Sequence, residues 1–283
     1  MINFKTLLQA ATALTLTAFL TAAVAQTVSI PDPGLNAAVR ETLQKPTGPL
    51  TQQDLLGLTI LNAPNRNIGS LAGLEAASNL STLLLHGNHV HAIDLSAWIN
   101  LAVLDLSNNS LTNVTLPGGM TNLFSLLLAD NGLTQLTLPA GLTRLEELNL
   151  NNNDLFSFEL PPTLTGLGTL DLGFNVFTNF SLPGGLTNLD LLRLSGNSLT
   201  NFIVPTGLTH LTQLYVDQNQ LASFALPEGV SNLHVLDLSF NGLTDVNLAS
   251  DQQNLISLNL DNNRLTSLNL PPNLTGLGLL QLR

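Results

Sequence analysis

The sequence predicts an α/β solenoid, in which a concave parallel β-sheet of about ten to eleven short strands is backed by an extended or turn-like convex side. Three observations predict it: a leucine-rich frame recurs along the chain, its period is nearly constant, and a proline recurs in the second half of most periods. With 44% hydrophobic and 10% charged residues, the 283-residue chain can bury a large core. A short helical cap is expected before the first strand.

The recurring frame is L-x-x-L-x-L-x-x-N-x-L, with clear copies at 101–111 (LAVLDLSNNSL), 145–155 (LEELNLNNNDL) and 255–265 (LISLNLDNNRL). Its leucines at positions 1, 4 and 6 alternate with polar residues, which predicts one short strand per repeat. The interval is 22 residues, with one of 21, and the frames start at Leu58, Leu80, Leu101, Leu123, Leu145, Leu167, Leu189, Leu211, Leu233, Leu255 and Leu277.

Position 9 of the frame holds an asparagine in most repeats. A buried turn leaves backbone groups that need partners, and an amide side chain can both donate and accept there. We therefore expect a structural ladder formed by Asn88, Asn109, Asn131, Asn153, Asn175, Asn197, Asn219, Asn241 and Asn263.

This frame and period resemble those of the leucine-rich-repeat family over about residues 58–283. The resemblance implies a horseshoe-shaped solenoid that recognises proteins. The second half of each repeat contains the recurring prolines, which disfavour a helix on the convex side. A column of Phe158, Phe180, Phe202 and Phe224 is expected to lie in the interior.

Residues 1–25 contain a single charge, Lys5, then an apolar stretch and the small-residue site Ala23-Val24-Ala25. This pattern predicts a signal peptide cleaved before Gln26, with an uncleaved membrane anchor as the alternative. The protein is then secreted, periplasmic or on the cell surface. No integral membrane segment is expected after cleavage, because polar residues or proline interrupt the later apolar runs.

Residues 26–57 are expected to form a helical cap. Asp32 is a candidate N-cap, with Pro33 in the first turn of a helix that ends before Pro46. Thr51 and Asp54 have the spacing of a capping box for a second, shorter helix. Together the two helices resemble the amino-terminal cap of secreted bacterial proteins of the internalin type.

The solenoid is expected to span residues 58–283 with no C-terminal cap visible, since the next ladder asparagine would fall two residues beyond Arg283. Three explanations stay open: a fragment of a longer reading frame, a tolerated edge, or self-association through the uncapped edge.

The charge balance argues against nucleic acid as a partner. Eight Lys and Arg against 19 Asp and Glu give −11, which becomes −12 when Lys5 is removed with the leader. An acidic surface favours basic or mixed-charge protein partners. The absence of Cys excludes disulfides, thiolate metal sites and a thiol nucleophile.

No catalytic residue and no cofactor is predicted, because the common hydrolase, metallopeptidase and nucleotide-binding motifs are missing. Outward-facing aspartates could in principle form a glycosidase pair, but loops that build a pocket are lacking. The histidines His86, His89 and His91 have spacing that could suit zinc or copper, although three freely varying surface residues are the simpler interpretation.

The candidate binding surface is the concave face, with its centre between Asp171 and Asp237. Its outward positions carry acids beside aromatic residues and a lone arginine, residue types that anchor interfaces. The predicted contact residues are Asp105, Asn149, Asp171, Phe174, Arg193, Tyr215, Asp217, Asp237, Phe240, Asn259 and Asp261.

The sequence therefore predicts an exported, non-catalytic module for protein recognition. Two alternatives stay open: a glycan-binding surface protein whose aromatic rings stack on sugars, and a structural stalk or fragment of a larger adhesin.

Overall fold

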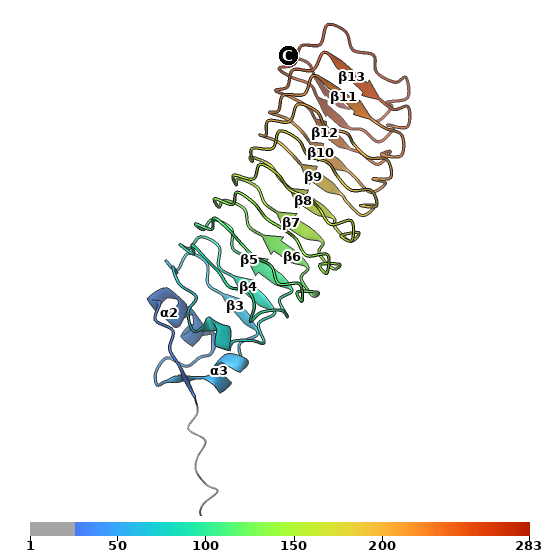
Figure 1. Ribbon diagram of the computed structural model, residues 1–283. Coiled ribbons are helices and arrows are strands. Elements are labelled where there is room, and N and C mark those ends of the chain that lie inside the picture. The colour runs from blue at the N-terminus through green and yellow to red at the C-terminus, as the bar shows by residue number, and fades with distance from the viewer. Residues whose placement is uncertain (1–25) are drawn as a thin grey trace, which may run out of the picture.

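The computed structural model describes residues 26–283, so the expected signal peptide at 1–25 lies outside the described residues. The chain forms an elongated, gently curved coil with a small helical unit at its amino-terminal end (Figure 1). An 11-stranded parallel sheet in the order β15-β14-β12-β10-β9-β8-β7-β6-β5-β4-β3 lines one side. The predicted solenoid and its number of strands are thus confirmed.

Each strand of the large sheet has three residues, which are paired in register with the equivalent residues of its neighbours. They are β3 (Ile60–Asn62), β4 (Thr82–Leu84), β5 (Val103–Asp105), β6 (Ser125–Leu127), β7 (Glu147–Asn149), β8 (Thr169–Asp171), β9 (Leu191–Arg193), β10 (Gln213–Tyr215), β12 (Val235–Asp237), β14 (Ser257–Asn259) and β15 (Leu279–Gln281).

The core is a continuous stack of leucines, since the frame leucines of neighbouring repeats lie against each other. Phe158, Phe180, Phe202 and Phe224 are buried in it as expected. At the last repeat the stack opens: Leu280 and Leu282 are 39% and 51% exposed, whereas the equivalent Leu258 and Leu260 are buried.

The convex side consists mainly of turns, with one short 3-10 helix, η1 (Leu74–Ala76). It also contains a two-stranded parallel sheet that the sequence analysis did not anticipate, formed by β11 (Ser223–Leu226) and β13 (Asp245–Leu248). Both strands lie just before the position of the recurring proline, which is Pro227 after β11 and is replaced by Ala249 after β13.

The amino-terminal unit contains the two predicted helices, α2 (Pro33–Thr42) and α3 (Gln52–Leu56). Asp32 caps α2 by accepting the N–H of Leu35, and Thr51 and Asp54 form a capping box at α3. The amino-terminal unit also contains an antiparallel pair of two-residue strands, β1 (Thr27–Val28) and β2 (Leu50–Thr51). In the part of the chain that the structure describes, no helix is long and apolar enough to span a bilayer.

Candidate functional site

The sheet register places four of the predicted contact residues side by side at the centre of the concave face. Asp171 on β8 is paired with Arg193 on β9, Arg193 with Tyr215 on β10, and Tyr215 with Asp237 on β12. Their side chains point away from the core because frame position 5 lies between the buried positions 4 and 6.

Arg193 is held by both of its neighbours. Its Nη1 lies 3.5 Å from Oδ2 of Asp171, and its guanidinium carbon lies 5.2 Å from the centre of the Tyr215 ring. The Tyr215 hydroxyl donates to Oε1 of Gln213 at 3.0 Å. An ion pair and a cation–π contact therefore hold the guanidinium of Arg193, whose side chain is still 46% exposed.

The acidic residues of this column also have a structural role that the sequence analysis missed. Oδ1 of Asp171 accepts the backbone N–H of Gly173 at 3.0 Å, and Oδ1 of Asp237 accepts that of Ser239 at 2.9 Å. The same contact, from residue i to i+2, recurs at Asp105, Asn149 and Asn259. Asp and Asn fit here because their short side chains reach the backbone just after the strand.

A shallow depression of about 320 Å³ lies beside Arg193. At its edge, Ser195 Oγ donates to Oδ1 of Asp217, and Gln218 Nε2 donates to Oδ2 of Asp217 at 3.1 Å. The depression is lined by Asn151, Asp171, Gly173, Phe174, Arg193, Ser195, Tyr215, Asp217 and Asp237. Three of these, Asn151, Gly173 and Ser195, were not among the predicted contact residues. All three occupy frame position 7, two residues after Asn149, Asp171 and Arg193 at position 5.

Phe174 reaches the depression from a left-handed backbone position. Frame position 8 has a positive φ from Asn65 to Asn262, and it is filled mostly by Asn, Asp, Gln or Gly. Phe174 and Phe240 are exceptions, with φ values of 50° and 53° and with 49% and 56% of their surface exposed.

The remaining predicted contact residues lie on the same face but outside the depression. Asn259 donates from Nδ2 to Oδ2 of Asp237 at 3.1 Å, and Asp261 accepts the backbone N–H of Arg283 at 2.6 Å. Phe240, Asn149 and Asp105 do not line it either. The structure therefore gathers six of the eleven predicted residues around one hollow.

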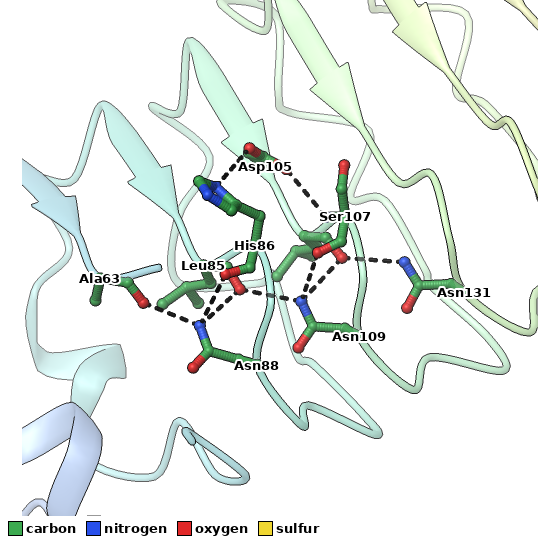
Figure 2. Close-up of polar contacts among 9 residues, drawn as sticks. Ala63, Leu85, His86, Asn88, Asp105, Ser107, Asn109 and Asn131 are labelled. Atoms are coloured by element: carbon green, nitrogen blue, oxygen red, sulfur yellow. Dashed lines mark hydrogen bonds and ion pairs between the residues drawn. The ribbon is translucent and has the colours of Figure 1, made fainter. Parts of the chain in front are cut away.

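The position 9 asparagines join each repeat to the one before it. In Asn153, Nδ2 donates to the carbonyls of Leu128, Leu150 and Asn151, while Oδ1 accepts the N–H of Leu133 at 3.0 Å. Figure 2 shows the corresponding bonds from Nδ2 of Asn88 and Asn109. The same arrangement is found at Asn131, Asn175, Asn197, Asn219, Asn241 and Asn263.

The structure does not gather His86, His89 and His91 into a cluster of metal-binding side chains. Nδ1 of His86 lies 3.2 Å from Oδ2 of Asp105 (Figure 2). Within residues 26–283, no three His, Cys, Asp or Glu side chains lie close enough together to hold a metal ion. The zinc or copper alternative therefore lacks a geometric basis.

A larger hollow, of about 930 Å³, lies on the amino-terminal cap and is lined by residues such as Pro31, Pro33, Arg40 and Pro46. Arg40 is already engaged there, since its guanidinium donates to Asn36 and to two backbone carbonyls. The hollow on the cap thus offers few free polar groups that could orient a ligand. The depression beside Arg193 is therefore the better candidate site.

Comparison with protein families finds six copies of the BspA-type leucine-rich repeat region, over residues 106–190 and 173–279. A comparison with curated protein sequences finds no significant match.

The fold is similar to that of several solved structures. The functional domain of InlJ from Listeria monocytogenes superposes with a TM-score of 0.81 at 26% identity, over 89% of this chain and 56% of that one. The internalin InlF from the same organism gives a TM-score of 0.70 at 23% identity, over 93% and 87%. YopM from Yersinia enterocolitica gives 0.62 at 29% identity, over 78% and 50%.

The chain thus spans little more than half the length of the InlJ domain. The InlJ functional domain includes a cysteine ladder, whereas the present chain has no cysteine, and asparagine side chains bond its neighbouring repeats to each other.

Proposed function

The chain belongs to the BspA-type leucine-rich repeat family, and from this we propose that it is an exported, non-catalytic binding protein that recognises another protein through its concave face. The similarity to internalins and YopM is consistent with a protein-interaction module. The single observation that carries the proposal is the central group in which Asp171 and Tyr215 hold an exposed Arg193.

This group has the properties of an interface centre. Arginine and tyrosine are among the residues enriched at the energetically dominant positions of interfaces, and here contacts within the protein already hold the arginine. A guanidinium that is already held loses less conformational entropy on binding. The long, open sheet offers contact area without enclosing a ligand, which suits a macromolecule better than a metabolite.

The concave face is predominantly acidic, so the expected partner is basic or mixed in charge. Arg193 is outnumbered there by Asp105, Glu147, Asp171, Asp217, Asp237 and Asp261. Such a surface attracts cationic partners during encounter and repels acidic ones.

Export is tested by expressing the full-length gene and measuring the mass of the amino-terminal peptide of the product. Cleavage by a signal peptidase at the proposed site leaves a protein that begins with Gln26. A product that retains Lys5 would instead identify an uncleaved leader and contradict the assignment of a signal peptide.

Binding is tested by capturing proteins from envelope and secreted extracts on the immobilised protein. The variant Arg193→Ser/Tyr215→Ser removes the central group, and Ile203→Ser, on the convex side and 73% exposed, is the matched control. All three proteins must first show the same circular-dichroism spectrum and melting temperature.

A protein retained by the parent and by the Ile203 variant, but lost from the double variant, supports the proposal. Equal retention by all three proteins counts against the concave face. If the parent is retained on immobilised polysaccharide and the double variant is not, the ligand is a glycan and the protein-recognition proposal is wrong.

A further inference from the structure

We propose that the depression beside Phe174 is a subsite for a single lysine or arginine side chain of the partner. This inference rests on the proposed function and makes it more specific, because it gives the chemistry of one contact. Four observations carry it: the unbalanced charge of the depression, the backbone conformation of Phe174, the position of its ring, and the size of the hollow.

The charge of the depression favours a cation. Three carboxylates line it, those of Asp171, Asp217 and Asp237, against the one guanidinium of Arg193, which is paired with Asp171. Asp217 and Asp237 take part in none of the ion pairs formed within residues 26–283. Two negative charges are therefore uncompensated at the site.

The hydrogen bonds of these two aspartates do not remove that charge. Asp217 accepts from Ser195 and Gln218, and Asp237 accepts from Ser239 and Asn259, all of which are neutral donors. A carboxylate offers about four lone-pair directions, so each still has acceptor capacity. The neutral donors fix the carboxylates in place and leave them able to bind an ammonium or guanidinium group.

Phe174 adopts a conformation that is costly for a bulky side chain and gains little burial from it. Its φ is 50° and almost half of its surface is exposed. Asn, which tolerates this conformation, fills the same frame position at 65, 108, 152 and 262. A strained residue that contributes little to the core indicates a functional role.

The next repeat leaves room for the ring of Phe174. At Gly196, the equivalent position, an added Cβ would lie 2.6 Å from Cδ1 and 2.8 Å from Cε1 of Phe174. The ring therefore occupies the space that a side chain at 196 would fill. Phe174 thereby lines the depression together with the carboxylates of Asp217 and Asp237.

An aromatic face together with carboxylates is the environment in which proteins bind cationic side chains. This molecule already contains one such arrangement, in which Arg193 lies over Tyr215 and beside Asp171. An acidic ligand would be repelled, and an apolar one would remove the negative charges of Asp217 and Asp237 from water without supplying a positive charge, at a large desolvation cost. The volume of about 320 Å³ suits the end of one long side chain.

The test uses the purified protein labelled with ¹⁵N and three probes: acetyl-Gly-Arg-Gly-amide, the same peptide with neutral citrulline in place of arginine, and maltohexaose. The readout is the chemical shift of the Gly173 and Gly196 backbone amides, which lie at and beside the depression. The variants are Phe174→Asn and Asp217→Asn. The control is Phe156→Asn, which removes another exposed phenylalanine, one that does not line the hollow and has no positive φ.

We expect saturable shifts with the arginine peptide and none with the citrulline peptide. Phe174→Asn and Asp217→Asn should each weaken binding about tenfold, which is the size of a cation–π contact or charge contact at a partly desolvated site. Phe156→Asn should bind like the parent.

Binding that is equal in the parent and in Phe174→Asn would overturn the subsite, as would a parent that shows no shift with arginine. Shifts with maltohexaose alone would assign the depression to a glycan. If the arginine peptide fails to bind but the extract still yields a partner that depends on Arg193 and Tyr215, the subsite is wrong and the proposed function stands.

Discussion

The ring of Phe174 covers Gly196 of the following repeat so closely that a methyl group at residue 196 would lie 2.6 Å from Phe174 Cδ1. Gly196 also has a φ of 66°, which L side chains rarely adopt. Two independent constraints therefore require glycine at this position.

Gly196→Ala should lower the free energy of unfolding by about 2 kcal/mol, through the left-handed backbone and the contact with the ring. Chemical denaturation measures the change. Gly184→Ala is the control, because an added Cβ at residue 184 meets no atom within 4 Å and no positive φ is involved. A loss that is equal in the two variants would show that neither the positive φ nor the contact with Phe174 requires glycine at residue 196.

Phe240→Asn should stabilise the protein by about 1 kcal/mol, because asparagine tolerates the left-handed conformation that Phe240 adopts at a φ of 53°. Little buried surface is lost, since more than half of Phe240 is exposed. The expected rise in melting temperature is about 2–4 °C for a chain of this size. A lower melting temperature would mean that the ring contributes more packing than strain.

Asn153→Ala should destabilise the protein by about 3 kcal/mol, because the buried N–H of Leu133 loses its acceptor and the carbonyls of Leu128, Leu150 and Asn151 each lose a donor. Urea titration followed by circular dichroism measures the effect. The exposed Asn179, whose side chain contacts only the neighbouring Thr178, is the control, and its change to Ala should alter stability by less than about 0.5 kcal/mol.

Stability in acid should depend on Asp54 of the capping box at α3. Hydrogen bonds from Lys45 and Thr51 lower the pKa of Asp54 from 3.8 to about 2. Since the folded-state pKa lies below the unfolded value, the ionised carboxylate favours folding above about pH 4, and this contribution is lost as the pH falls from about 4 to 2. The difference in melting temperature between the parent and Asp54→Asn should therefore shrink over that range. A difference that stays constant down to pH 2 would contradict this assignment.

The sequence was sufficient to predict the sheet and its register. Any other pairing of the strands would bring some of the frame leucines out of the core. The helix that starts at Pro33 and the capping box of Thr51 and Asp54 were equally local signals, and the structure contains both. The column that joins Asp171, Arg193, Tyr215 and Asp237 followed directly from the period.

Other features depend on geometry between repeats and carry no local signal. The contact of Phe174 with Gly196 requires knowing that position 8 has a positive φ and that the side chain leans toward the next repeat. The pairing of β1 with β2 joins two-residue strands that are separated by a helix. No periodicity exists in segments that short.

A second row of side-chain bonds was missed because its residue type varies. Asn79, Asn188, Asn232 and Asn254 each donate to a carbonyl 23 residues earlier, and at the equivalent position a ring nitrogen of His210 contacts the carbonyl of Thr187. Arg144 and Gly166 occupy the same position in other repeats, so the column is not uniform in the sequence.

The asparagine ladder gives the solenoid a direction. Asn153 completes the turn of the preceding repeat by accepting the N–H of Leu133, and in the same way Asn175 accepts the N–H of Leu155. In each case the acceptor lies 20 residues later in the chain than the donor. The protein is synthesised from its amino terminus. The backbone N–H groups in the turn of each repeat can therefore be fully hydrogen-bonded only after about one further repeat has left the ribosome. The last repeat to emerge in the nascent chain therefore still lacks these hydrogen bonds, while the repeats before it already have them.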